Sequence, residues 1–88
     1  MTVRKCVAEF AEAMEEKLSA NDHKGGWDRS SVTYLLERLR QEVDELDLAA
    51  SKTCSHCGVA HEPNTKRIID EAADVANFAM MIADRYKP

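Results

Sequence analysis

Residues 72–83 read AADVANFAMMIA, and this stretch decides the fold. Apart from Asp74 and Asn77 it is apolar, and at about 100° per residue its apolar side chains surround most of a helix instead of forming one stripe. A helix of this kind must be covered on several sides. Two other helices of one short chain cannot cover it, so the sequence predicts that subunits associate into a four-helix or larger bundle, as a dimer or tetramer.

Three helices account for most of the chain. The apolar stretch belongs to a helix over residues 65–86, capped by Asn64 or Thr65. A second helix over residues 30–51 begins near Ser30 or Ser31. Its expected core positions are Val32, Leu35, Leu36, Leu39, Val43, Leu46 and Ala50. The first helix, over residues 2–19, is amphipathic, with its apolar stripe at Val3, Val7, Phe10, Met14 and Leu18. The turn residues NDHKGG at 21–26 separate the first two helices, and no strand is expected, so residues 1–88 are predicted to form one all-α domain.

Composition limits the possible partners. The chain has 88 residues and a formal net charge of −4, and its basic residues are scattered, which argues against nucleic-acid binding. The N-terminal segment lacks the apolar core of a signal peptide, and no apolar run approaches the roughly 20 residues that span a bilayer. We therefore expect a cytoplasmic protein with no membrane partner.

Two acidic pairs lie on the helices where hydrocarbon should be buried. Glu42 flanks the apolar stripe of the second helix and Glu45 lies one step further round, beside Arg38. Glu71 and Asp74 lie among apolar residues of the third helix. If the two helices pack antiparallel, the pairs face each other and can bind Mg²⁺ or Mn²⁺ through oxygen. The alternative, that these acids are solvated surface charges, suits Asp44 on the outer side of its helix but not Glu71.

These acidic motifs carry a resemblance to a known family. Glu42-x-x-Glu45 followed by Glu71-x-x-Asp74, with Gly26-Trp27-Asp28 upstream, resembles the signature of the MazG-like, all-α nucleoside triphosphate pyrophosphohydrolases. The resemblance covers roughly residues 24–86, and the compact size is similar to that of members from phages and mobile elements. Gln41 departs from the pattern, because many members have a further glutamate there.

The resemblance implies an activity and roles for residues. It implies hydrolysis of a nucleoside triphosphate between the α and β phosphates to a monophosphate and pyrophosphate, for control of the nucleotide pool. The implied ligands of Mg²⁺ or Mn²⁺ are Glu42, Glu45, Glu71 and Asp74, with one glutamate able to act as general base. The candidate substrate contacts are Arg38, Lys66 and Arg67 for phosphate, Trp27 for the base, and Asn77 for sugar or phosphate. For each cation the alternative is an ordinary surface charge, and for Trp27 it is a core anchor.

The connection over residues 52–64 contains a second cluster of candidate ligands. Cys54 and Cys57 form a Cys-x-x-Cys pair, and His61 lies four residues beyond it, which suits a structural zinc ion. Its fourth ligand could come from His56, His23, Cys6 or a neighbouring subunit. Free thiols are the alternative. Two other functions stay open: a non-enzymatic, zinc-stapled helical interaction module, and a narrower pyrophosphatase for one nucleotide such as dUTP, dGTP or phosphoribosyl-ATP.

Overall fold

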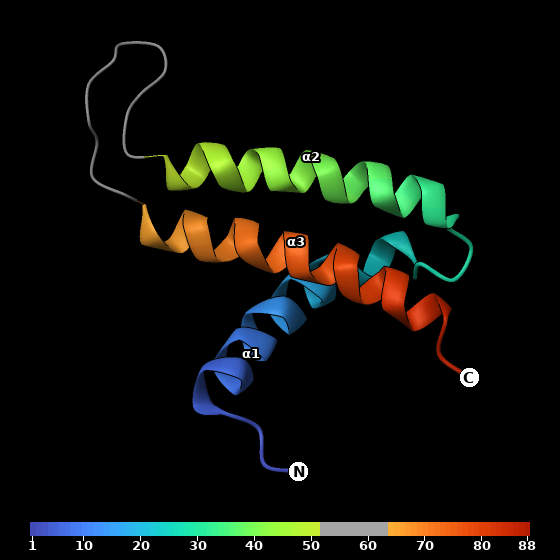
Figure 1. Cartoon of the computed structure of the whole chain (residues 1–88), viewed down its shortest axis with the longest axis horizontal. Helices are drawn as coiled ribbons and strands as arrows, with labels where there is room; N and C mark the ends of the chain where they lie inside the picture. The colour runs from blue at the N-terminus through green and yellow to red at the C-terminus, as the bar shows by residue number, and fades with distance from the viewer. Residues whose placement is uncertain (52–63) are drawn as a thin grey trace.

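The computed structural model describes residues 1–51 and 64–88, and these ranges contain helices and no strand. The helices are α1 (Lys5–Ala20), α2 (Val32–Ala50) and α3 (Thr65–Arg85), with a short 3-10 helix, η1 (Asp22–Lys24), after α1. Figure 1 shows α2 and α3 side by side in opposite directions, with α1 crossing α3 at an angle. The predicted all-α fold is confirmed for these residues, whereas Cys54, Cys57 and His61 lie outside them.

Side-chain caps fix where α2 and α3 begin. The hydroxyl oxygen of Ser31 accepts a hydrogen bond from the Tyr34 amide at 3.1 Å, and the Asn64 side-chain oxygen accepts one from the Arg67 amide at 3.0 Å. Each cap satisfies an amide that has no partner within its helix, and such a cap contributes about 1 kcal/mol. α1 has no side-chain cap, and it begins at Lys5 instead of the expected Thr2.

The buried core is small, and α3 lies at its centre. α3 packs against both α1 and α2, and the buried apolar side chains of the described ranges are Leu35, Ala49 and Ala73. The expected core face of α2 is wrong in part, because Leu36 and Val43 are 36% and 46% exposed. α2 instead turns residues seven positions apart toward α3, namely Leu35, Glu42 and Ala49. Because Glu42 lies on this side of α2, it is buried.

α1 rests on α3 without burying any of its own side chains completely. Phe10, Met14 and Leu18 are half-buried, whereas Val3 and Val7, the other positions of the expected stripe, are exposed. A hydrogen bond fixes the crossing, because the Asn77 side-chain amide donates to the Met14 carbonyl at 3.1 Å. α1 is therefore positioned by a polar contact as well as by apolar packing.

The segment between α1 and α2 runs back along the C-terminal part of α3. Gly25 follows η1 with a φ of 87°, in the left-handed region that glycine adopts at low cost. The Trp27 indole then donates a hydrogen bond to the Asp84 carboxylate at 3.0 Å, and the Arg85 guanidinium donates to the Ser30 carbonyl. These bonds hold the segment against α3. None of the helices in residues 1–51 and 64–88 has the length and apolar character needed to cross a membrane.

Candidate metal site and adjoining pocket

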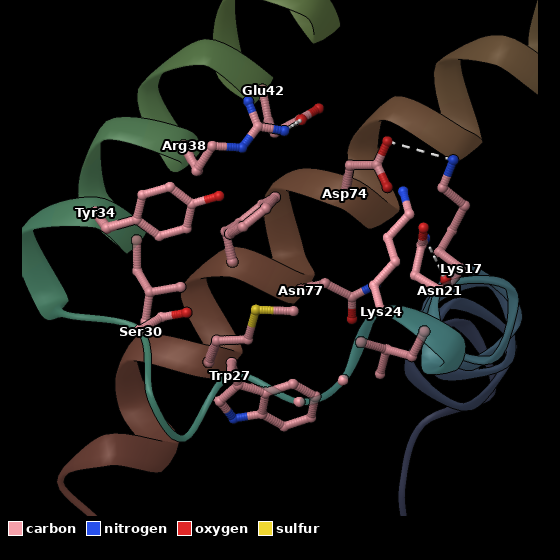
Figure 2. Close-up of a pocket in the computed structure, with 16 residues that line it drawn as sticks. Lys17, Asn21, Lys24, Trp27, Ser30, Tyr34, Arg38, Glu42, Asp74 and Asn77 are labelled. Carbon is pink, nitrogen blue, oxygen red and sulfur yellow. Dashed lines mark hydrogen bonds and ion pairs between the residues drawn. The ribbon is translucent and has the colours of Figure 1, made fainter.

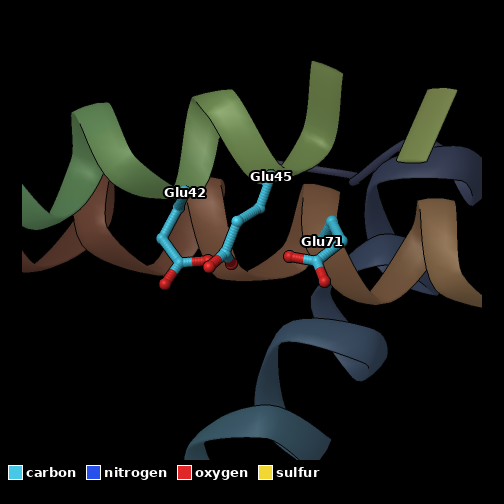
Figure 3. Close-up of side chains that lie close together, drawn as sticks. All are labelled: Glu42, Glu45 and Glu71. Atoms are coloured by element: carbon cyan, nitrogen blue, oxygen red, sulfur yellow. The ribbon is translucent and has the colours of Figure 1, made fainter. Parts of the chain in front are cut away.

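Three glutamates meet where α2 and α3 face each other. Glu42 and Glu45 lie one turn apart on α2, and Glu71 projects toward them from α3 (Figure 3). One carboxylate oxygen from each lies within 4.8 Å of the others. The antiparallel packing of α2 and α3 therefore brings one predicted acidic pair next to a member of the other.

Burial makes this cluster electrostatically unfavourable. Glu42 is 5% exposed, and its Oε2 has no hydrogen-bond partner; the Oε2 of Glu71 is likewise buried and without a partner. Burial, then the neighbouring carboxylates of Glu45 and Asp74, raise the pKa of Glu42 to about 7, while Arg38 acts in the opposite direction. The pKa of Glu71 is also raised, first by burial and then by Glu45 and Asp74. Either a proton or a cation is needed to balance the charge.

The donor set fits a hard divalent cation. Carboxylate oxygens are the ligands that Mg²⁺ and Mn²⁺ prefer, and one oxygen each of Glu42 and Glu71 is buried without a hydrogen-bond partner. A buried acceptor without a partner costs about 1–3 kcal/mol, and more when it is charged. A cation bound to Glu42, Glu45 and Glu71 would remove that cost.

Asp74, the fourth predicted carboxylate, is not in this group of three. Its Oδ2 lies 3.4 Å from the ammonium nitrogen of Lys17 on α1, and its side chain is 25% exposed. Its charge nevertheless contributes to the raised pKa of both Glu42 and Glu71, so it lies close to the cluster. Asp74 thus lies between the three glutamates and a lysine that the sequence did not single out.

A pocket of about 470 Å³ adjoins the carboxylates, and Glu42 and Asp74 form part of its wall (Figure 2). α1, η1, the segment after η1, α2 and α3 all contribute to it. Its cationic side chains are Lys17, Lys24 and Arg38, its aromatic side chains are Trp27, Tyr34 and Phe78, and its amides are Asn21 and Asn77. The pocket therefore combines positive charge and aromatic surface beside a carboxylate cluster.

Three of the predicted substrate contacts line this pocket. Arg38 donates hydrogen bonds to Glu42 at 2.8 Å and to Gln41, and its guanidinium carbon lies 5.2 Å from the centre of the Phe78 ring. Trp27 is half-buried and is held by Asp84. Asn77 is 4% exposed; its amide nitrogen is bonded to Met14, and its Oδ1 is buried without a partner.

The other two predicted phosphate contacts do not line the pocket. Lys66 is exposed and forms an ion pair with Asp70 at 2.8 Å, one turn along α3. The positive charge of Arg67 opposes the rise in the pKa of Glu71, so this side chain lies near the carboxylates although it is exposed. Of these two residues, only Arg67 lies near the site.

Sequence reasoning missed the part of the pocket that comes from α1 and η1. Lys17, Asn21 and Lys24 line it, as does Tyr34 on the first turn of α2. For Asn21 and Lys24 the one signal in the sequence is the turn at residues 21–26, which by itself indicates only a connector. Where that turn lies depends on how α1 crosses α3, which is a tertiary property.

Comparison of this chain with protein-family models, curated proteins and solved structures finds no match. The MazG-like resemblance stays a prediction that depends on the motif residues alone.

Proposed function

We propose that this protein is a metal-dependent nucleoside triphosphate pyrophosphohydrolase of the MazG-like type, acting in the cytoplasm. One observation carries the proposal: the buried, unpartnered Oε2 of Glu42, clustered with Glu45 and Glu71 at the edge of a cationic and aromatic pocket. A polar atom that is buried without a partner is costly, and here a divalent cation would supply the missing contact.

The pocket suits a nucleotide in size and in chemistry. Its volume of about 470 Å³ is within the range of roughly 300–1,000 Å³ that is typical of small-molecule sites. The rings of Trp27, Tyr34 and Phe78 offer faces on which a base can stack, and Lys24 and Arg38 can donate to phosphate oxygens. A triphosphate lying across the pocket would extend toward Glu42 and Asp74.

Each part of the site has a role in the proposed hydrolysis. Mg²⁺ or Mn²⁺ would supply charge neutralisation for the triphosphate and would lower the pKa of a coordinated water. Glu42, Glu45, Glu71 and Asp74 would hold the cation, and one of the glutamates would accept the proton from the water that attacks phosphorus. Arg38 orients phosphate oxygens. The products are a nucleoside monophosphate and pyrophosphate, and no covalent intermediate is needed.

A homo-oligomer is part of the proposal, as a dimer or a tetramer. In the described ranges the buried apolar side chains are few, and α2 carries an exposed or half-buried stripe at Val32, Leu36, Leu39, Val43, Leu46 and Ala50. Its alternating spacing of four and three residues is the repeat by which helices of a bundle pack. Val43→Asp should shift the sedimentation coefficient to that of a smaller species, whereas Asp44→Asn should not. A wild-type protein that sediments as a monomer would contradict this part of the proposal.

The zinc prediction at Cys54, Cys57 and His61 lies outside the described residues. We propose a structural zinc ion there that fixes the connection between α2 and α3. Metal analysis of the purified protein should find about one zinc per chain, and Cys54→Ser should abolish it. Zinc without any nucleotide turnover would favour the non-enzymatic interaction module.

The decisive experiment is a substrate panel. Each NTP and dNTP, and phosphoribosyl-ATP, is incubated with the protein and Mg²⁺ or Mn²⁺, and monophosphate and pyrophosphate are measured. Glu71→Gln should abolish turnover and keep the helix content, whereas Asp44→Asn, on the exposed side of α2, should keep full activity. Formation of diphosphate and orthophosphate would refute cleavage between the α and β phosphates. A steep preference in the panel would identify an enzyme for one nucleotide.

A further inference from the structure

An ion pair connects α1 to the carboxylate cluster. The ammonium nitrogen of Lys17 lies 3.4 Å from the Oδ2 of Asp74, and in the described part of the chain this is the one ion pair that joins two helices. Both side chains line the pocket, and Figure 2 shows the contact at its edge. Lys17 can therefore contact an anion that lies on this side of the pocket.

The position of Lys17 is fixed by a hydrogen bond one turn away. Met14, one turn before Lys17 on α1, accepts the hydrogen bond from Asn77, one turn after Asp74 on α3. This bond holds the two helices so that the lysine and the aspartate face each other. The ammonium group itself is on a flexible four-carbon stem, so it can change partner while α1 stays in place.

The contact between Lys17 and Asp74 is weak enough to be exchanged. Its length of 3.4 Å exceeds the roughly 2.8 Å of a charge-assisted hydrogen bond, and the two side chains are 32% and 25% exposed. Ion pairs that solvent reaches contribute little to stability. A triphosphate, with several negative charges, is a stronger partner for the ammonium group than one carboxylate.

Asp74 also has a second possible partner. It lies one turn from Glu71 on α3, and its negative charge contributes to the raised pKa of both Glu71 and Glu42. A carboxylate that is neutralised by an ammonium group attracts a cation less than a free one does. Three glutamates are thus grouped, whereas the fourth carboxylate is held by α1.

We propose that Lys17 couples polyphosphate binding to metal binding by exchanging partners. When the pocket is empty, Lys17 pairs with Asp74 and keeps this carboxylate from the cation. When a polyphosphate enters, Lys17 turns to the phosphate oxygens, and Asp74 is released to join Glu42, Glu45 and Glu71. The proposal rests on the proposed function, and it makes Lys17 a positioning residue for the metal site. Because such coupling is reciprocal, cation and polyphosphate each strengthen the binding of the other.

The test measures the affinity of the protein for each of two ligands separately, by calorimetry. Mn²⁺ alone is titrated into the protein, and inorganic tripolyphosphate is titrated in the presence of excess Mg²⁺. Lys17→Met keeps the apolar stem and removes the charge, so Mn²⁺ should bind roughly fivefold more tightly. Tripolyphosphate should bind at least about tenfold more weakly, because a charge-assisted contact is lost. Lys17→Arg should recover most of the tripolyphosphate affinity.

Two controls separate this coupling from a structural role. Lys5→Met removes an exposed lysine of α1 that pairs with Glu9 and does not line the pocket, and it should change neither affinity. In a protein that already carries Asp74→Asn, Lys17→Met should no longer strengthen Mn²⁺ binding, because the effect acts through Asp74. Circular dichroism checks that each variant is folded.

The possible outcomes are distinct. Opposite changes in the two affinities support the coupling, whereas unchanged or weaker Mn²⁺ binding, or unchanged tripolyphosphate binding, by Lys17→Met overturns it. A strengthening of Mn²⁺ binding that persists with Asp74→Asn also overturns it. If the wild-type protein binds no Mn²⁺, the proposed function fails, and the coupling fails with it.

Discussion

Replacing Glu42 with glutamine should stabilise the protein when no metal is present. The pKa of this buried carboxyl rises from 4.5 to about 7 on folding, with burial as the main cause. Between these two pH values the folded chain keeps a proton that the unfolded chain has released, so the free energy of unfolding falls as the pH rises. Compared with low pH, where Glu42 is protonated in both states, the free energy of unfolding at about pH 8 is lower by roughly 3 kcal/mol. Roughly 2 kcal/mol of this decrease occurs between about pH 5.5 and about pH 8.

Glu42→Gln keeps the shape of the side chain and removes its ionisation. The amide oxygen can still accept from Arg38, and the amide nitrogen can donate to Glu45, so the main change is that no charge is buried. We expect the free energy of unfolding of the variant to exceed that of the wild type by up to roughly 3 kcal/mol at about pH 8, and by much less at about pH 5.5.

The assay is urea unfolding followed by circular dichroism, in EDTA, at both pH values and at one protein concentration, because an oligomer's stability depends on concentration. Asp44→Asn, two residues away on the exposed side of α2, is the matched control and should leave the pH dependence as it is in the wild type. The reasoning would be refuted if the wild type became more stable from about pH 5.5 to 8, or if Glu42→Gln were the less stable protein at the higher pH.

Three other predictions follow from contacts described above. Mn²⁺ should raise the melting temperature more at about pH 8 than at about pH 6, because ligand carboxyls must lose their protons; equal shifts would argue against the glutamate site. Trp27→Phe should cost about 1 kcal/mol in urea unfolding through loss of the bond to Asp84, and should cost nothing further in a protein that already carries Asp84→Ala. Asn77→Asp should destabilise the protein by roughly 3 kcal/mol at neutral pH, because it buries a charge facing the Met14 carbonyl; an equally stable variant would show that the contact is not formed.

Local signals in the sequence were sufficient to predict the helices and to predict that carboxylates of α2 and α3 meet. Ser31 and Asn64 cap α2 and α3 because their side chains satisfy amides within their own turn, which requires no knowledge of the rest of the fold. The sequence could predict that Glu45 and Glu71 lie near each other, because carboxylates on two apolar, antiparallel helices must either face each other or be solvated. Such arguments use only helical geometry.

The parts that were not predicted depend on how helices pack on one another. The apolar stripe of α2 placed Glu42 at the edge of the core, yet α3 packs against the side that carries Leu35 and Ala49, and this buries Glu42. Lys17 was unremarked because the crossing of α1 over α3 decides its neighbours, and the periodicity of α1 does not specify that crossing. Contacts between distant segments of the chain were the missing information.

The three clustered glutamates all project from α2 and α3, and none comes from an irregular segment. A paramagnetic ion at that point would have a location that varies little, since regular helices hold its ligands. Bound Mn²⁺ would then act as a spectroscopic reference inside the molecule, broadening the NMR signals of nearby nuclei more strongly than those of distant ones. The distance of α1 from the bound Mn²⁺ could then be compared with and without polyphosphate, without attaching any label to the chain.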